Sequence, residues 1–269
     1  MKNNNRGILI IIGGAEDKEN ECIILNSVAK LSGGQNGKII ILTVATEYPD
    51  EVGKEYTSIF NNLGVPNVET VHIETREQAN NKRKIQQMED ASCIFFTGGD
   101  QLKITSLIGG TKIENFFRIS YKEGMVIAGT SAGASAMSET MIISGIEDES
   151  PKKCTVKMAP GLGLIEGVVI EQHFAQRGRI GRLLASLAQN PRVLGIGLDE
   201  DTAIIVQPDR RFKVIGSNAV TILDAVKCSY TNASESRPDD ILALTDIVIH
   251  ILPNEYEFDL NTRVPILRR

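Results

Sequence analysis

One segment of the sequence has the residue types and spacing of a serine nucleophile. Residues 126–128 form an apolar run that leads into Gly129, Thr130, Ser131, Ala132 and Gly133, a G-x-S-x-G sequence followed by small residues suited to a helix start. A nucleophilic serine needs such a strand-to-helix turn, because flanking glycines permit close approach and leave the hydroxyl exposed. The helix N-terminus and the Ala132 N–H can stabilise an oxyanion. We predict that Ser131 is the nucleophile; the alternative is a turn whose small residues only allow close packing.

The general base would be one of the three histidines. His72 and His250 lie inside apolar or alternating runs, where a structural role is the better interpretation. His173 stands at the end of an apolar run and beside polar residues. Ligands of parallel α/β sheets gather at such strand ends. We therefore predict His173 as the general base.

A carboxylate should orient the imidazole of the base, and two glutamates downstream of Ser131 are candidates. Glu200 follows a strand of small residues, so we expect its side chain at a strand end. Glu149 belongs to an acidic stretch, 147–149, that could be a solvated loop. We favour Glu200 and keep Glu149 as the alternative.

Two further glycine-containing loops follow predicted strands. Residues 96–101 place two glycines at a helix start, where Gly99 can supply a second oxyanion donor and Gln101 an amide near the same sheet edge. A plain strand-to-helix turn is the alternative. The loop at 13–17 lacks G-x-G-x-x-G, and the chain has no G-x-x-x-x-G-K-[ST], so nucleotide binding is not supported. We expect no cofactor and no metal.

Three arginines, Arg177, Arg179 and Arg182, follow His173 closely. Cations at a helix start oppose the helix dipole by roughly 0.3 to 1 kcal/mol each. Their forked guanidinium groups are suited to binding carboxylates. We predict that they recognise substrate; the alternative is a solvated or interface-forming basic turn.

The elements that would position these residues follow an α/β pattern. Short β-branched runs at 7–12, 38–45, 68–73, 91–97 and 125–129 alternate with amphipathic stretches, one of which is a polar helix at 76–90. This pattern predicts a mostly parallel central sheet flanked by helices. Residues 193–224 read as additional strands, and 230–240 as a surface loop. No linker interrupts the chain, so we predict one domain, 1–269.

Composition excludes several classes of protein. The formal net charge is −5 and no basic stripe is present, which argues against nucleic-acid binding. No apolar run approaches the roughly 18 residues that span a bilayer. The polar start favours a cytoplasmic location. The four scattered cysteines indicate reduced thiols.

Four segments together closely resemble the cyanophycinase family of serine peptidases, which is related to dipeptidase E and has a sheet similar to that of class I glutamine amidotransferases. They are G-G-A-E-D-K at 13–18, F-T-G-G-D-Q at 96–101, G-T-S-A-G-A at 129–134 and E-Q-H-F-x-x-R-G-R-x-G-R-L at 171–183. The amidotransferases carry cysteine where this chain carries Ser131.

The resemblance implies hydrolysis of cyanophycin, a poly-aspartate backbone with arginine on each β-carboxyl, to β-aspartyl-arginine dipeptides. Gln101 and Gln172 match the family's substrate-contacting positions. Glu171 stands where the family usually has aspartate, and its carboxylate would lie near the substrate guanidinium.

Two other functions are kept as alternatives. An aspartyl dipeptidase resembling dipeptidase E would act on short peptides, which need fewer charged subsites than the arginine-rich segment offers. A non-catalytic binding protein would not need Ser131 and His173 together. We further expect a homodimer.

Overall fold

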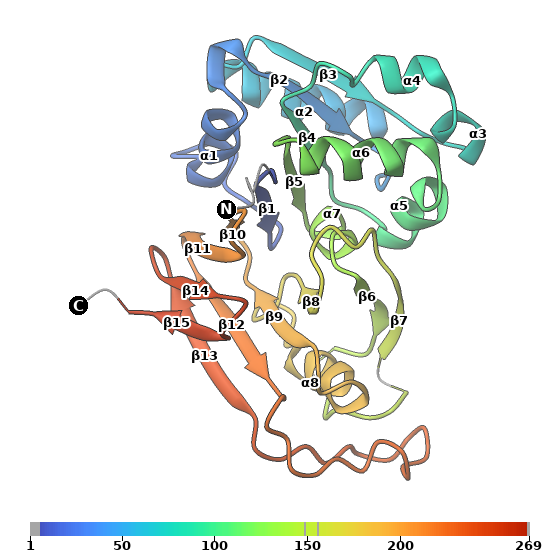
Figure 1. The fold of residues 1–269 in the computed structure, drawn as a ribbon, viewed down its shortest axis with the longest axis vertical. Helices are drawn as coiled ribbons and strands as arrows, with labels where there is room; N and C mark the ends of the chain where they lie inside the picture. The colour runs from blue at the N-terminus through green and yellow to red at the C-terminus, as the bar shows by residue number, and fades with distance from the viewer. Residues whose placement is uncertain (1–5, 148, 155, 268–269) are drawn as a thin grey trace.

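The computed structural model describes residues 6–147, 149–154 and 156–267. Its largest element is a nine-stranded sheet with the order β15-β14-β11-β10-β1-β5-β4-β2-β3 (Figure 1). Five neighbouring strands are parallel: β1 (Leu9–Ile12), β5 (Val126–Thr130), β4 (Cys93–Phe96), β2 (Lys38–Leu42) and β3 (Asn67–Val71). Antiparallel strands extend the other side: β10 (Thr202–Val206), β11 (Arg211–Gly216), β14 (Glu257–Asp259) and β15 (Val264–Ile266).

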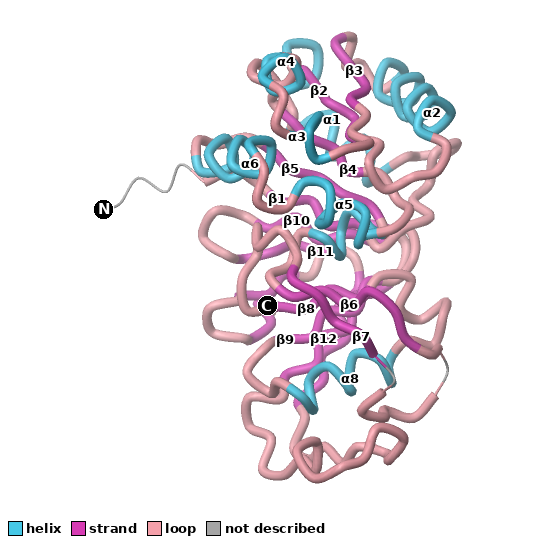
Figure 2. The backbone as a smooth tube through the Cα atoms, turned by 90° about the vertical axis from the view of Figure 1, so that its right-hand side faces the viewer, coloured by secondary structure: helices cyan, strands magenta, loops and turns pink. Residues whose placement is uncertain are grey.

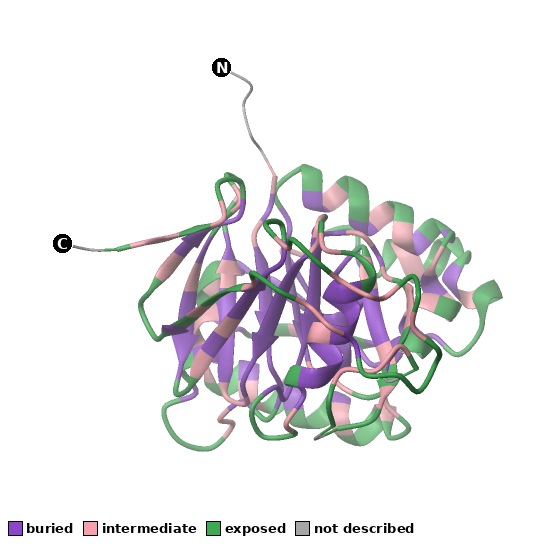
Figure 3. Cartoon of the chain, turned by 90° about the horizontal axis from the view of Figure 1, so that it is seen from below, coloured by how far each residue is buried: buried purple, intermediate pink, exposed green. Residues whose placement is uncertain are grey.

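Helices cover both faces of the parallel strands. They are α1 (Ile23–Leu31), the short 3-10 helix η1 (Gly34–Asn36), α2 (Pro49–Asn62), α3 (Arg76–Ala79), α4 (Lys82–Gln86), α5 (Gln101–Ile108), α6 (Lys112–Lys122) and α7 (Ala132–Ala136). Ile10 and Ile12 of β1 pack in one core with α1 and α2, while Leu9 and Ile11 face a second core with α5, α6 and α7. Strand side chains alternate between faces, so a sheet covered on both sides has continuous apolar strands. Figure 3 shows this buried centre.

A second, four-stranded sheet lies beyond the antiparallel side of the first. Its order is β13 (Val248–Pro253), β12 (Ala219–Asp224), β9 (Leu194–Leu198) and β8 (Val168–Glu171). The two-stranded pair β6 (Thr140–Gly145) and β7 (Val156–Pro160) and the helix α8 (Ile180–Gln189) accompany it. Figure 2 shows α8 at the far end of the molecule from α1 and α2. A third core of apolar side chains joins α8 to this region.

The predicted fold class, a mixed α/β structure with a mostly parallel central sheet and additional C-terminal strands, is confirmed. The single helix predicted over 76–90 is wrong, because α3 ends at Ala79 and α4 begins at Lys82. The Asn81 side chain accepts a hydrogen bond from the Arg83 N–H at 2.9 Å and so caps a new helix. Asparagine favours such caps over helix interiors.

The described residues give three further findings. None of their helices is long and apolar enough to cross a membrane. They contain no group of three His, Cys, Asp or Glu side chains arranged to hold a metal ion. All four cysteines are free thiols, with Cys22 and Cys93 buried, Cys228 half-buried and Cys154 exposed.

Candidate active site

Ser131 lies on a sharp turn between the central strand β5 and the helix α7. Its backbone has φ 51° and ψ −110°, a conformation that costs of order 1–3 kcal/mol for a residue with a side chain. Its N–H donates to the carbonyl of Ile12 at 3.0 Å, which fixes the turn against β1. The flanking glycines are sterically required: a Cβ at Gly129 would lie 2.8 Å from the Gly133 backbone, and one at Gly133 would lie 2.6 Å from the carbonyl oxygen of Phe96. Strained backbone of this kind is typical of functional sites.

The structure brings Ser131, His173 and Glu200 into one hydrogen-bonded chain. Ser131 Oγ lies 3.0 Å from His173 Nε2, and His173 Nδ1 lies 2.6 Å from Glu200 Oε1. Because a carboxylate only accepts hydrogen bonds, Nδ1 is the donor to Glu200. Nε2 is then free to accept the proton of the serine hydroxyl. This is the arrangement of a nucleophile, a base and an orienting acid.

The second acidic candidate, Glu149, is placed elsewhere. Its carboxylate forms an ion pair with Lys152 at 2.9 Å. Glu200 is held in position by the turn after β9, where its N–H donates to Gln176 Oε1 at 2.9 Å. Of the two predicted alternatives, Glu200 is therefore the one that contacts His173.

The position of His173 depends on the loop that follows β1. The His173 N–H donates to the Gly13 carbonyl at 2.9 Å, and the next residue, Phe174, donates to the carbonyl of Leu198 at 3.0 Å. A Cβ built on Gly14 would lie 2.4 Å from both Cε1 and Nε2 of the imidazole. Sequence reasoning did not assign this role to the loop. The only available signal was the pair of glycines directly after a buried strand.

Burial sets the acid–base behaviour of His173. The residue is 8% exposed, and this desolvation lowers its pKa from the ordinary value of 6.5. The hydrogen bond to Glu200 raises the pKa and so opposes burial, while the charge of Arg177 lowers it further. A lowered pKa keeps the imidazole neutral at neutral pH, which is the form that can accept a proton.

The predicted oxyanion donors are Ala132, which directly follows Ser131, and Gly99, which follows the glycine that faces Ser131. Ala132 is fully buried as the first residue of α7. In the other loop Gly98 is the glycine that faces the serine, since a Cβ there would lie 3.5 Å from Ser131 Cβ. Gly99, at φ 136°, packs against the Ala45 carbonyl, which a Cβ would approach to 2.2 Å. Both glycines therefore belong to the loop beside Ser131.

The two predicted substrate-contacting glutamines differ in their contacts. Gln172 Oε1 lies 3.4 Å from Ser131 Oγ and can accept its hydrogen bond. Gln101, the first residue of α5, donates through Nε2 to the Ile142 carbonyl at 2.8 Å. Gln172 thus borders Ser131 Oγ, and Gln101 ties α5 to β6.

The three arginines after His173, predicted to recognise substrate, differ from one another in burial and in partners. Arg179 and Arg182 are each 5% exposed and pair with the buried Glu171, at 3.1 Å and 3.2 Å. Glu147 adds a second carboxylate 2.6 Å from Arg179 Nη2. Arg177 is the exposed member of the three, with its side chain 3.8 Å from Glu147. The chain therefore supplies carboxylate partners for Arg179 and Arg182 itself.

The buried Glu171 is held between two cations. Burial raises its pKa to about 7, and Arg182 and Arg179 oppose the rise. Arg182 Nε and Glu171 Oε2 are within ion-pair distance but outside hydrogen-bond geometry, so each has no hydrogen-bond partner among the described atoms. Arg179 Nη1 also donates to the Gln172 carbonyl at 2.9 Å. The ion-pair network therefore anchors the segment that carries Gln172 and His173.

A buried glutamate beside Thr130, the residue before Ser131, was not found by sequence reasoning. Glu16 is 4% exposed, and its Oε2 accepts a hydrogen bond from Thr130 Oγ1 at 2.6 Å. Its Oε1 accepts from the Tyr56 hydroxyl at 2.5 Å. Thr130 directly precedes Ser131, so Glu16 fixes the strand end on which the nucleophilic turn is built.

A sheet of this kind, ending in a serine beside a histidine and a carboxylate, defines a serine-type hydrolase. The family model for Peptidase family S51 matches residues 9–214. The chain belongs to peptidase family S51 and is a peptidase.

Named relatives agree with this family. A cyanophycinase of Geminocystis herdmanii (strain PCC 6308) is 39% identical over 267 residues, covering 99% of this chain and 98% of the relative. A cyanophycinase of Trichormus variabilis (strain ATCC 29413 / PCC 7937) is 36% identical over 256 residues, covering 95% and 86%. The crystal structure of a peptidase from an acI-B1 Actinobacterium aligns with TM-score 0.65 and 21% identity over 90% of this chain and 96% of that one. This last similarity concerns the fold alone.

Proposed function

We propose that the chain is a cyanophycinase, a serine exopeptidase that releases β-aspartyl-arginine dipeptides from cyanophycin. The observation that carries the proposal is the hydrogen-bonded series Ser131, His173 and Glu200 in a chain related to cyanophycinases over nearly its whole length. The chain acts as one peptidase domain and needs no cofactor in this scheme.

In the first half of the reaction, Ser131 Oγ attacks the scissile carbonyl carbon and passes its proton to His173 Nε2. Glu200 stabilises the resulting imidazolium through Nδ1. The N–H groups of Ala132 and of the loop at Gly98 and Gly99 receive the negative charge on the carbonyl oxygen. His173 then protonates the leaving amine, the C–N bond breaks, and an acyl-enzyme on Ser131 remains.

In the second half, water replaces the amine. His173 Nε2 accepts a proton from the water as its oxygen attacks the acyl carbon. The same proton returns to Ser131 Oγ when the ester bond breaks, so the free enzyme is regenerated together with a carboxylic acid.

The residues around Ser131 are divided between substrate binding and positioning. We assign binding to Gln172, Gln101 and the exposed Arg177, whose guanidinium suits a substrate carboxylate. Glu171, Arg179 and Arg182 are buried and pair with one another, so we assign them to positioning the His173 segment. Removing one partner of a buried ion pair typically costs about 3–5 kcal/mol of stability.

We also propose a cytoplasmic homodimer. The edge strand β13 presents the exposed apolar side chains of Ile249 and Ile251, which a contact between two copies would remove from water. Light scattering coupled to size-exclusion chromatography measures the oligomeric state directly. A monomeric mass at micromolar concentration would contradict the homodimer.

Incubation with purified cyanophycin tests the proposed function. Mass spectrometry should identify β-aspartyl-arginine as the main released product. Short aspartyl dipeptides serve as the comparison substrate for the alternative activity. If the protein cleaves these dipeptides but leaves cyanophycin intact, the result would favour the aspartyl dipeptidase.

A further inference from the structure

A second hollow lies at the same edge of the central sheet as the nucleophile. It has a volume of about 360 Å³ and is lined by residues that follow β2 and β3 and by Lys103 and Leu107 of α5. Its floor is apolar, with Val44 and Ile73 fully buried and Leu107 half-buried. Small-molecule sites of roughly 300 Å³ and above, with apolar walls and a few polar groups, are the size class that holds a ligand.

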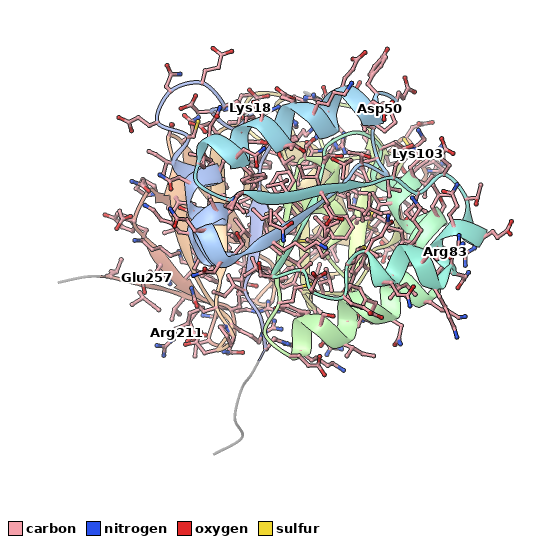
Figure 4. The ribbon with its side chains drawn as sticks, turned by 90° about the horizontal axis from the view of Figure 1, so that it is seen from above. Lys18, Asp50, Arg83, Lys103, Arg211 and Glu257 are labelled. Atoms are coloured by element: carbon pink, nitrogen blue, oxygen red, sulfur yellow. The ribbon has the colours of Figure 1, made fainter. Side chains whose placement is uncertain are left out.

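The rim of this hollow carries charges of both signs. Lys103 and Glu47 are exposed, and among the described residues neither forms an ion pair. Glu74 is exposed as well and lies 3.5 Å from His72 Nε2. Figure 4 shows Lys103 on the same side of the molecule as Asp50, which follows Pro49 of the hollow. One ammonium and two carboxylates are thus available to an incoming molecule.

The hollow is connected to the nucleophile through the loop at 96–101. Gly98 faces Ser131, and Gly99 packs against the backbone of Ala45 and Thr46, with a Cβ at Gly99 reaching within 2.8 Å of the Thr46 nitrogen. The Asp100 N–H donates to the Ala45 carbonyl at 3.0 Å. Thr46 lines the hollow. The loop at 96–101 therefore contacts both the Ser131 turn and the segment that lines the hollow.

We propose that this hollow, which we call the Lys103 groove, is a distal subsite that binds a repeat unit of the polymer away from the scissile bond. This inference rests on the proposed function. Each repeat unit of cyanophycin carries one free carboxylate and one guanidinium. Lys103 pairs with the carboxylate, Glu47 and Glu74 accept from the guanidinium, and the apolar floor covers the methylene groups.

Chain-length dependence distinguishes a distal subsite from the reaction centre. In Lys103→Glu the KM for long-chain cyanophycin should rise about three- to tenfold, while kcat is unchanged. The same variant should cleave a fragment of two repeat units with unaltered kcat/KM, because the two units on either side of the scissile bond occupy the reaction centre and leave no third unit for the groove. The rise in KM should shrink in 0.5 M salt, since exposed charges are screened.

Lys122→Glu is the matched control, since it makes the same charge change on an exposed residue at the end of α6. It should leave both substrates unaffected. Glu47→Gln should raise the KM for the polymer without altering the fragment. Equal effects of Lys103→Glu on polymer and fragment, or no effect on either, would overturn the proposal that the Lys103 groove is a distal subsite.

A binding measurement separates this inference from the proposed function. In a Ser131→Ala background, which cannot turn over, Lys103→Glu should weaken binding of long-chain cyanophycin by the same three- to tenfold factor. Binding that depends on Lys103 in an enzyme without cyanophycinase activity would contradict only the proposed function. If the wild type cleaves cyanophycin but Lys103→Glu does not weaken binding of the polymer, only the proposed role of the Lys103 groove would be contradicted.

Discussion

Gly14 packs directly against the imidazole of His173, although the two residues lie far apart in the chain. A side chain of even one carbon at Gly14 would come within 2.4 Å of Nε2, the atom that faces Ser131 Oγ. The carbonyl of the neighbouring Gly13 accepts the His173 N–H. The loop after β1 therefore fixes both the backbone and the ring of the proposed base.

Gly14→Ala should lower kcat about a hundredfold, because the new methyl group displaces the ring by about an ångström and misplacement of this size has that effect. Steady-state kinetics on cyanophycin measure the change. The control is Gly64→Ala, at φ 88° with no atom within 4 Å of the new Cβ, against φ 100° at Gly14. Both variants carry the left-handed backbone cost of roughly 1–2 kcal/mol, so only displacement of the ring distinguishes them. A similar kcat in the two variants would show that Gly14 does not hold the imidazole of His173 in its reactive position.

Glu200→Gln should lower kcat more than a hundredfold, because an amide neither stabilises the imidazolium nor enforces the tautomer that Glu200 selects. Glu149→Gln removes a charge that pairs with Lys152 and should leave kcat within twofold of the wild type. The ratio of the two kcat values is the measurement. The opposite ranking would transfer the orienting role to Glu149.

The acid limb of kcat/KM against pH should have its midpoint below 6.5, because burial lowers the pKa of His173 and the neutral imidazole is the active form. Arg177→Gln should move this midpoint upward, since the arginine charge lowers the pKa. Because folding lowers the pKa of His173, the folded state binds fewer protons than the unfolded state near this pKa. The stability contribution of His173 is therefore complete above pH 6.5 and is lost as the pH falls through the folded-state pKa. A midpoint above 6.5 would show that Glu200 outweighs burial.

Glu16→Ala should lower the free energy of unfolding by several kcal/mol, because it leaves the buried hydroxyls of Tyr56 and Thr130 without an acceptor, at about 1–3 kcal/mol each. Urea denaturation measures this loss. Glu19→Ala, at an exposed position in the same loop, should be neutral. Equal stability of the two variants would mean that water replaces the carboxylate.

Local patterns predicted the parallel strands, the turn at Ser131 and the choice of His173, because each is encoded within a few consecutive residues. The contacts of Gly14 and Glu16 could not be predicted in this way, since they join segments distant in the chain. The residue types of Glu171, Arg179 and Arg182 indicated charged groups near His173. Their mutual pairing depends on burial, which the local sequence of an exposed-looking basic turn does not reveal.

The serine mechanism is tested most directly by comparing Ser131→Ala with the wild type on purified cyanophycin, with released β-aspartyl-arginine quantified by mass spectrometry. Far- and near-ultraviolet circular dichroism should show that the variant keeps its fold, because alanine removes only the hydroxyl. Loss of a triad nucleophile typically lowers kcat about a million-fold, so dipeptide release should fall to the limit of detection. A folded variant that retains a tenth of the wild-type rate would contradict the account.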